Sequence, residues 1–275
     1  NTLRKHLSLI KGGRLAAAAK PATVVSLILS DVVGDDLDVI ASGPTVPDSS
    51  TFNDCLGIVA KYGIGNQLPK PVLEHLNKGL AGQVQETPKQ HDTAFDKTSN
   101  IIIGSNIEAL IAAEKEAATR NYNTLVLSSM IEGETCEVAR VHAAIAREII
   151  KTGIPLHPPA CILSGGETTV TLKGDGLGGR NQEFALCVVG NIAGQNPTVI
   201  LSGGTDGNDG PTNAAGAIAD NTSLERAAAL NLKVDDYLAN NDSYHFFEAL
   251  GDLLLTGPTN TNVMDLRIIL IPNSP

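Results

Sequence analysis

Three aspartates crowd the end of an apolar run near the start of the chain. The run at residues 24–29 stops at Ser30, and Asp31, Asp35 and Asp36 follow closely. Carboxylates at such short spacing must share protons or hold a cation. Oxygen ligands without a neighbouring His or Cys favour Mg²⁺ over zinc. A solvated acidic turn, in which Asp side chains accept backbone N–H groups, fits the same spacing, so both interpretations stay open.

A glycine-rich loop followed by an arginine is the second candidate. Residues 174–179 fit the G-x-G-x-x-G pattern of dinucleotide-binding loops. However, residues 168–173 follow the preceding strand so closely that we expect a hairpin rather than a parallel βαβ unit. The alternative is a loop whose N–H groups hold an anion together with the following helix N-terminus. Arg180 opposes the helix dipole there, which an anionic ligand would explain; an ordinary surface ion pair with Glu183 is the other interpretation.

Two further loops have a similar character. Residues 202–212 combine four glycines with Asp206 and Asp209, and residues 256–265 are rich in hydroxyl and amide side chains. An ordinary turn would account for either loop alone. Ligands collect at the carboxyl ends of strands in open α/β sheets, so several such loops at one sheet edge favour a binding site.

The chain opens with a basic cluster. It contains Arg4, Lys5, His6, Lys11 and Arg14. In a protein of net charge −10, such a cluster would form a local positive site for a small anionic substrate. The alternative is a helix end whose cations complement the C-terminal dipole.

Short apolar runs alternate with helical patterns along the chain. Runs rich in Ile, Val and Leu are typical of strands buried between helix layers. We expect strands at residues 24–29, 100–103, 124–127, 160–163, 198–201 and 266–271. We expect helices at residues 107–121, 134–152, 181–193 and 222–230. This alternation predicts an α/β fold with a largely parallel sheet. Pro158 and Pro159 favour a domain boundary at residues 153–159, and residues 77–99 are expected to form a mobile surface loop.

Composition argues against several classes of protein. The 275 residues include 30 Asp+Glu against 20 Lys+Arg, which disfavours a nucleic-acid-binding face. Apolar runs fall short of the roughly 18 residues of a membrane helix, so we expect no membrane span. Cys55, Cys136, Cys161 and Cys187 form no CxxC pair, which favours buried thiols in a reducing compartment over zinc or disulfides. The start at Asn1, without a leader-like segment, predicts a fragment whose preceding part is missing.

Taken together, the motifs resemble those of the glycerate 2-kinase family, two-domain kinases that end in a MOFRL domain. The matching pieces run in order along the chain: RKHLSLIKGGRLA (4–16), LILSDVVGDDLDVIASGPTVPD (27–48), IIIGSN (101–106), SGGETTVTLKGDGLGGRNQE (164–183), LSGGTDGNDGPTNAAGA (201–217), NDSYHFF (241–247) and TGPTNTNVMDL (256–266). The resemblance implies two α/β domains, with sheets flanked by helices and an active-site cleft between them. Residues 1–152 would be the C-terminal part of the Rossmann-like kinase domain, and residues 160–275 the MOFRL domain. The family's GAGKA-like loop, with its lysine, and its SGGGSALL-like loop have no counterpart in this sequence.

The resemblance implies phosphorylation of D-glycerate by ATP with Mg²⁺, giving 2-phosphoglycerate. On this basis we assign Arg180, Asp31 and Asp206 to catalysis, with Arg180 on the transferring phosphoryl group or on the glycerate carboxylate. We assign Asp31, Asp35 and Asp209 to the metal. The residues assigned to substrate or nucleotide are Lys11, Arg14, Ser42, Gly43, Thr45, Ser105, Asn106, Gly165, Gly166, Glu167, Gly178, Gly179, Asn181, Gln182, Glu183, Gly203, Gly204, Thr205, Gly207, Thr259 and Asn262. Spacing leaves open which aspartate accepts the hydroxyl proton and which binds the metal.

Two alternative functions stay open. Some family members carry the name hydroxypyruvate reductase, which would predict NAD(P)H oxidation and a ribose-binding acid that we do not find. A chain without the lysine loop would instead bind nucleotide or glycerate without turnover. We expect small-molecule partners, neither nucleic acid nor membrane, and a homodimer as one arrangement. The expected location is the cytoplasm, or the mitochondrion if a leader has been lost.

Overall fold

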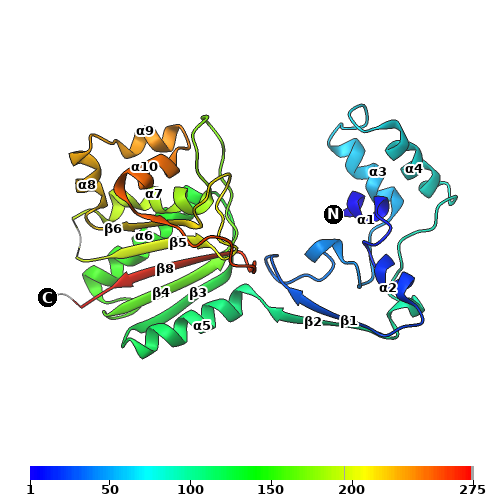
Figure 1. Cartoon of the computed structure of the whole chain (residues 1–275), viewed down its shortest axis with the longest axis horizontal. Coiled ribbons are helices and arrows are strands. Elements are labelled where there is room, and N and C mark those ends of the chain that lie inside the picture. Colours follow the sequence, from blue (N-terminus) through cyan, green and yellow to red (C-terminus); the bar gives the residue numbers. More distant parts are fainter. Residues whose placement is uncertain (195, 274–275) are drawn as a thin grey trace. The chain divides into compact units, whose positions relative to one another are not determined.

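Two compact units make up the chain. The computed structural model describes residues 1–194 and 196–273. Unit 1 contains residues 1–28 and 35–103, and unit 2 contains residues 29–34 and those from Gly104 onward. Figure 1 shows the helices and strands of both units.

Unit 1 combines short helices with a two-stranded sheet. Its elements are α1 (Thr2–Leu7), α2 (Arg14–Ala19), β1 (Val24–Leu29), η1 (Ile40–Ser42), α3 (Phe52–Lys61), α4 (Lys70–Leu80), η2 (Thr93–Phe95) and β2 (Thr98–Gly104). Thr51 and Asp54 form a capping box that begins α3, because the side chain of each accepts the backbone N–H of the other. Phe52, Cys55 and Leu76 form the small core between these helices.

The basic cluster at the N-terminus is partly neutralised inside unit 1. Lys5 is 3% exposed and pairs with Asp38 and, at 3.2 Å, with Asp48. His6 is buried, and its Nε2 lies 3.1 Å from a Glu86 carboxylate oxygen. A buried cation such as Lys5 needs such partners, and His6 is buried beside it, so both side chains serve the packing of unit 1 rather than a positive site for a substrate.

The polar segment predicted as a mobile loop is partly helical and partly buried. α4 continues to Leu80 and η2 interrupts the remainder. Thr87 and Ala94 are buried, and Glu86 accepts the N–H of Phe52 at 2.9 Å. The segment therefore closes over the helical core, a tertiary contact that its polar composition did not indicate.

The two-stranded sheet of unit 1 exposes one apolar face. Val24 N donates to Lys97 O and Ser30 N donates to Gly104 O, so β1 and β2 run parallel. Alternate apolar side chains are exposed along both strands: Val25, Leu27, Leu29, Ile101 and Ile103. Both predicted strands are confirmed, but their side chains show the period of two that marks a half-buried sheet, not burial on both faces.

A six-stranded mixed sheet forms the centre of unit 2. Its strands are β3 (Asn123–Ile131), β4 (Ala160–Gly166), β5 (Val199–Gly204), β6 (Gly216–Asp220), β7 (Leu253–Leu254) and β8 (Asp265–Ile271), in the order β3-β4-β8-β5-β6-β7. β3 and β4 pair in parallel, whereas β8 lies antiparallel between β4 and β5, and β6 is antiparallel to β5. The α/β class is confirmed. The predicted common direction holds among β3, β4 and β5, and the sheet is mixed because the last strand of the chain inserts between two of them.

Helices cover both faces of this sheet (Figure 1). They are α5 (Asn106–Thr119), α6 (Thr135–Thr152), α7 (Arg180–Ile192), α8 (Ser223–Ala229), α9 (Val234–Ala239) and α10 (Ser243–Leu250). The central strand β8 alternates between the two cores. Ile268 and Leu270 pack in the core under α5, whereas Ile269 and Ile271 pack in the core under α6 and α7. The four predicted helices are α5, α6, α7 and α8, with bounds shifted by one or two residues, and Gly153 ends α6 with a positive φ as expected.

One connection differs from the sequence prediction. Residues 168–173 run as an irregular strap, and Thr169 makes an isolated parallel bridge with Glu134 in place of the predicted hairpin.

Residues 153–159 join α6 to β4 inside unit 2, and the compact division of the chain falls near residue 104. The reason is that β3 and β4 pair across the proline-rich connection, which holds both of its sides in one sheet. A domain boundary at residues 153–159 stays a prediction.

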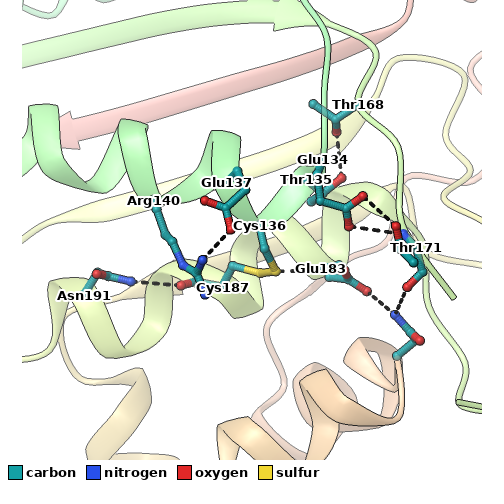
Figure 2. The surroundings of a disulfide bond; sticks show 11 residues. Glu134, Thr135, Cys136, Glu137, Arg140, Thr168, Thr171, Glu183, Cys187 and Asn191 are labelled. Carbon is teal, nitrogen blue, oxygen red and sulfur yellow. Dashed lines mark hydrogen bonds and ion pairs between the residues drawn. A yellow bond between two sulfur atoms is a disulfide. The ribbon is translucent and has the colours of Figure 1, made fainter. Parts of the chain in front are cut away.

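A disulfide joins α6 to α7. Cys136 and Cys187 are 51 residues apart in sequence, and their Cα atoms are 5.4 Å apart (Figure 2). Cys55 and Cys161 are free and buried, and burial raises the pKa of their thiols to about 12 and about 11. The prediction of unpaired thiols is therefore wrong for Cys136 and Cys187, because helix packing brings together cysteines that the sequence separates.

We expect this disulfide to stabilise unit 2. Closing a loop of 51 residues restricts the unfolded chain and contributes about 4 kcal/mol in the chain-entropy account. Reducing agent should therefore lower the midpoint of thermal unfolding. The Cys136→Ala/Cys187→Ala variant should start at the lower midpoint and show no response to reductant. An unchanged midpoint in a sample whose thiol count proves full reduction would contradict a stabilising cross-link.

Candidate active site

A carboxylate from another loop holds the N-terminus of α7. Asp209 accepts the backbone N–H of Asn181 at 3.0 Å and that of Gln182 at 2.8 Å. The side-chain amides of both residues also donate to Asp209. Burial raises the pKa of Asp209, although these N–H groups oppose the rise. Asp209 therefore caps α7, and because both of its oxygens accept N–H groups, capping replaces the predicted role as a metal ligand.

Glycines at the end of the preceding loop let this cap approach. A Cβ atom at Gly179 would lie 2.4 Å from the carboxylate carbon of Asp209. A Cβ atom at Gly178 would lie 2.2 Å from Ser243 Oγ, at the start of α10. Both positions thus require glycine for contacts within the protein, in addition to any contact with a ligand.

Side chains from residues 240–242 hold the first part of the glycine-rich loop. Asn241 Oδ1 accepts the N–H of Lys173 at 2.6 Å, and Asp242 Oδ1 accepts the N–H of Leu177 at 2.9 Å. The interpretation of the loop as an anion cradle is thereby limited to its last residues, Gly178 and Gly179, which are the ones assigned to a ligand. The first amides bind the protein itself, and only the end of the loop next to α7 is left for a ligand.

Arg180 donates two parallel hydrogen bonds to a buried carboxylate. Its Nε and Nη2 donate to the two oxygens of Asp265 at 2.7 and 3.0 Å, and its Nη1 lies 2.9 Å from Glu167 Oε1. The side chain of Asp265 is 0% exposed, whereas that of Glu167 is 46% exposed. Burial alone would lower the pKa of Arg180, but the hydrogen bonds and charge of Asp265 raise it. The guanidinium therefore stays charged, with Asp265 and Glu167 as partners in place of the Glu183 pairing considered from the sequence.

Asp265 is the residue that sequence reasoning missed. It is the first residue of β8 and also accepts Asn181 Nδ2 at 2.9 Å and Arg267 Nη2 at 3.3 Å. Arg267 is 1% exposed, and its guanidinium lies 5.2 Å from the ring centre of Phe184. A usable pattern was present, since positions 265 and 267 share the buried alternation of β8 and both carry charge. Charged side chains at inward positions of an apolar strand are rare unless they are paired.

A pocket of about 870 Å³ lies against this arginine. It is lined by the predicted site residues Asp31, Glu167, Gly178, Gly179, Arg180, Glu183 and Asp209. Val33, Val170 and Leu172 add apolar wall. Its volume is in the range of small-molecule sites. The structure thus gathers acids, glycines and the arginine into one hollow within unit 2.

Glu183 is a buried acid in the pocket wall. It is 6% exposed and accepts Asn241 Nδ2 at 3.0 Å. Burial raises its pKa; the hydrogen bond from Asn241 opposes this rise, and the charge of Glu134 adds to it. Its other oxygen lies 3.9 Å from Cys136 Sγ, beside the disulfide (Figure 2). The carboxyl group therefore protonates more readily than that of an ordinary glutamate.

A smaller pocket of about 350 Å³ shares Asp31 with the larger one. Its lining is Leu29, Asp31, Asp206, Pro258, Asn260, Thr261 and Asn262. Its lining thus includes carboxylate, amide and hydroxyl groups beside apolar surface. Because Asp31 lines both hollows, the structure connects two predicted catalytic residues, Arg180 and Asp206, through adjoining pockets.

Several predicted binding residues fasten two loops of unit 2 together. Thr205 Oγ1 donates to Met264 O at 2.7 Å and accepts the N–H of Val263 at 2.8 Å. Thr259 Oγ1 donates to Thr205 O, and Asn262 Oδ1 accepts the N–H of Met264 at 3.0 Å. The contacts of Thr205 and Thr259 bind the loop after β5 to the loop before β8, whereas that of Asn262 lies within the second loop. Together they position the acids that the two loops carry.

Asn106 fastens α5 to the start of β8. Its Nδ2 donates to the carbonyl oxygens of Val263 at 2.7 Å and Asp265 at 2.9 Å. Asn106 is the first residue of α5, directly after the N-cap residue Ser105. A Cβ atom at Gly165 would lie 1.7 Å from Asn106 Oδ1, so only glycine fits there. The contacts of these predicted binding residues are contacts of packing.

The other predicted glycines of unit 2 lie at strand ends and in the loop after β5. Gly166 ends β4, and Gly203 and Gly204 end β5, where both strands pair with the start of β8. A Cβ atom at Gly207 would lie 2.1 Å from Gly257 O. The absence of side chains at these positions allows backbone segments to approach closely around the site.

The predicted binding residues of unit 1 contact the backbone of their own unit. Lys11 Nζ donates to Ala41 O at 2.8 Å, and Arg14 Nη2 donates to Gln85 O at 3.2 Å. The other predicted binding residues of unit 1 lie in the turn beside Lys11; they are Ser42, Gly43 and Thr45. Asp35 also belongs to unit 1. A role of these residues in binding stays a prediction.

The predicted metal set does not form a cluster. Within residues 1–194 and 196–273, the structure has no group of three or more His, Cys, Asp or Glu side chains placed to hold a metal ion. Asp31 and Asp206, which line one pocket, are the acids on which a metal site could still be built.

A mixed α/β sheet with an arginine-lined pocket among its strand-end loops is typical of enzymes that bind small anions. Two family models match this chain. The MOFRL family matches residues 160–265, and a domain of unknown function, DUF4147, matches residues 1–77. The MOFRL match begins at residue 160, which is the first residue of β4. The sequence predicts the start of that domain at the same residue.

The chain is similar to glycerate kinases over nearly its whole length. It is 40% identical to the glycerate kinase of Macaca fascicularis, over 98% of this chain and 78% of that protein. It is 43% identical to the D-glycerate 2-kinase of Thermotoga maritima, over 98% of this chain and 62% of that protein. A crystal structure of glycerate kinase from that organism matches 98% of this chain and 62% of its own, with a TM-score of 0.86. The chain therefore belongs to the glycerate kinase family.

A further relative carries a different name. A protein of Agrobacterium vitis, named as a hydroxypyruvate reductase, is 45% identical over 98% of this chain and 60% of its own length. The chain spans about three fifths of the length of several relatives that it matches. Among the helices that the structure describes, none has the length and apolar character needed to cross a membrane.

The cap on α7 gives a stability prediction. Asp209→Ala would leave the N–H groups of Asn181 and Gln182 buried without an acceptor, and should lower the free energy of unfolding by about 2 kcal/mol. Asp175→Ala, at an exposed position of the preceding loop, is the control and should change it by less than about 0.5 kcal/mol. Urea unfolding of both variants measures the difference, and equal stabilities would show that Asp209 does not cap α7.

Proposed function

We propose that this protein phosphorylates D-glycerate with ATP, giving 2-phosphoglycerate. The observation that carries the proposal is the charged guanidinium of Arg180, which Asp265 holds in the wall of a pocket of about 870 Å³. Membership of the glycerate kinase family supports the reaction, since two of the relatives are named glycerate kinase and D-glycerate 2-kinase.

Phosphoryl transfer requires mainly positioning and neutralisation of charge. A guanidinium meets both needs because its N–H groups match the oxygens of phosphate and carboxylate. Nη1 of Arg180 pairs with Glu167, whose side chain is half-exposed, so an anionic ligand can displace that carboxylate. We assign Arg180 to the transferring phosphoryl group or to the glycerate carboxylate.

Mg²⁺ fits the acids of the smaller pocket. Asp31 and Asp206 offer carboxylate oxygens, and Asn260 offers an amide oxygen beside them; such oxygens are the ligands that Mg²⁺ prefers. Proteins usually hold Mg²⁺ with one or two carboxylates together with phosphate oxygens, so one carboxylate of this pair suffices. When bound, the ion would supply neutralisation of phosphate charge. The aspartate that does not bind the metal could accept the proton of the glycerate hydroxyl.

The end of the glycine-rich loop suits the phosphates of ATP. Gly178 and Gly179 line the larger pocket next to Arg180, and residues without side chains let phosphate oxygens approach the backbone. Val33, Val170 and Leu172 offer apolar surface in the same pocket. ATP and glycerate would thus share the larger pocket.

A reductase is less well supported. The relative from Agrobacterium vitis carries that name, and residues 174–179 fit the sequence pattern of a dinucleotide-binding loop. In the structure, however, an irregular strap separates β4 from α7, and β4 pairs with β3 and β8. Asn241 and Asp242 also occupy the first amides of the loop. The turn of a dinucleotide-binding βαβ unit is therefore replaced by a different structure at this loop.

Three expectations from the sequence stay predictions. They are a cytoplasmic location, a homodimer, and an active-site cleft between two domains.

The proposed activity gives a direct test. With D-glycerate, ATP and Mg²⁺, a coupled assay should detect ADP release that EDTA abolishes. Arg180→Ala should lower kcat/KM by about 10²- to 10³-fold, because a charged donor to the transition state is lost. Arg226→Ala is the matched control, since Arg226 pairs with Asp220 and Asp252 elsewhere in unit 2, and it should change kcat/KM less than about threefold.

Other outcomes of this assay separate the alternatives. Calorimetric binding of ATP or glycerate without ADP release would identify a binding chain that does not catalyse. Oxidation of NAD(P)H with hydroxypyruvate would support the reductase. A protein that neither binds these ligands nor turns them over would refute the proposal.

The contact between Glu167 and Arg180 gives a prediction of opposite sign. Glu167→Gln removes a carboxylate that competes with an anionic ligand for Nη1 of Arg180, so the Kd for ATP or for glycerate should fall a few-fold. The effect is small because half-exposed ion pairs are weak. Glu137→Gln, at an exposed pair with Arg140, is the control and should leave both Kd values unchanged. Unaltered affinities in Glu167→Gln would show that no ligand reaches Nη1.

A further inference from the structure

Asp265 accepts hydrogen bonds from four donors although its carboxylate is fully buried. Arg180 donates through Nε at 2.7 Å and through Nη2 at 3.0 Å. Asn181 Nδ2 donates at 2.9 Å and Arg267 Nη2 at 3.3 Å. A buried carboxylate is stable only with such partners. The position of Asp265 and the position of the Arg180 guanidinium are therefore linked.

The backbone holds Asp265 independently of Arg180. Asp265 begins β8 and pairs with Gly166 of β4 on one side and with Gly204 of β5 on the other. Asn106 also donates to its carbonyl oxygen at 2.9 Å. Since strands on both sides and a helix residue fix this backbone, the carboxylate is in place whether or not the pocket holds a ligand. The two glycines leave room beside it for the arginine.

A second arginine compensates for the charge of Asp265. The guanidinium of Arg267 is buried against Phe184, and its Nη2 donates to Thr168 Oγ1 at 3.2 Å as well as to Asp265. Asp265 thus lies between two guanidinium groups, and the charge of Asp209 acts on both arginines as well. An anion in the pocket can therefore be attracted to Arg180 only where it displaces the carboxylate of Glu167 from Nη1.

The two partners of Arg180 differ in exposure. Asp265 takes the edge formed by Nε and Nη2 and is 0% exposed, whereas Glu167 takes Nη1 and is 46% exposed. A ligand entering the pocket can displace the carboxylate at the surface, but not the one within the sheet. One edge of the guanidinium is therefore fixed, and one nitrogen is left to exchange partners.

We propose that Asp265 is a positioning residue for phosphoryl transfer, which locks one edge of the Arg180 guanidinium so that Nη1 meets the anionic ligand. The inference rests on the function proposed above, and it assigns to Asp265 no contact with the ligand. Its physical basis is preorganisation: a donor that is already oriented needs no reordering during the reaction.

A double-mutant cycle on kcat/KM tests the inference. Asp265→Asn keeps the shape of the side chain but loses the charge and one acceptor of the paired hydrogen bonds. It should lower kcat/KM by about 30- to 100-fold, mainly through kcat. In the Arg180→Ala background, the same change should cost less than about threefold, because Asp265 acts through Arg180. Asp252→Asn is the matched control, since Asp252 pairs with Arg226; it should lower kcat/KM less than about threefold in either background.

Arg180→Lys is the companion variant. Lysine keeps the positive charge but cannot occupy both oxygens of Asp265 in parallel, so its kcat/KM should fall to within about threefold of that of Arg180→Ala. If the protein binds ligand without turnover, the same cycle is read as the Kd for 2-phosphoglycerate. Thermal unfolding of every variant shows which ones fold; if Asp265→Asn does not fold, the lysine variant alone decides.

Different results overturn different statements. Equal fold-losses for Asp265→Asn with and without Arg180, or near-native activity of Arg180→Lys, would overturn the positioning role while the proposed function stands. A wild-type protein that neither phosphorylates glycerate nor binds 2-phosphoglycerate would overturn the proposed function, and the positioning role with it.

Discussion

The first turn of α7 is anchored between two buried carboxylates, and the wall of the candidate site depends on this anchoring. Asp209 accepts the backbone N–H groups of the turn, and Asp265 accepts the side chains of Arg180 and Asn181. A cation in the first turn of a helix is unfavourable toward the helix dipole. Here Asp265 compensates for that cost. The direction of Arg180 is consequently set by tertiary contacts and not by the helix that carries it.

Local patterns were sufficient to predict most elements of unit 2. The helical periodicity of residues 134–152 and the glycine after it define α6 almost to the residue, because both features act within a few positions of the chain. The apolar runs likewise mark β4, β5 and β8. Direction was harder to predict, since a run of Ile, Val and Leu is the same in a parallel and in an antiparallel strand. For β8, the apolar pattern therefore predicts a strand but not its antiparallel direction.

Contacts between distant positions limited the prediction of the site. Arg180 and Asp265 are 85 residues apart, and Lys173 and Asn241 are 68 apart, so no spacing rule connects them. A glycine in the sequence can also have two explanations, a close contact within the protein or a contact with a ligand. Gly178 and Gly179 are required where Ser243 and Asp209 approach them, and a sequence alone does not tell such a need from contact with a phosphate. Cys136 and Cys187 are a further example, because their pairing also depends on a contact between positions that are far apart in the sequence.

The structure separates the acids of unit 2 by what they contact. Asp209 and Asp265 are buried and accept N–H groups from α7 and β8, so they shape the site. Asp31 and Asp206 line hollows, and Asp31 lines the same hollow as Arg180. If the proposed reaction occurs here, a phosphoryl group that meets both Arg180 and Asp31 lies where these two residues line the larger pocket. The apolar side chains of Val170 and Leu172 in the same pocket are then left for the rest of the ligand.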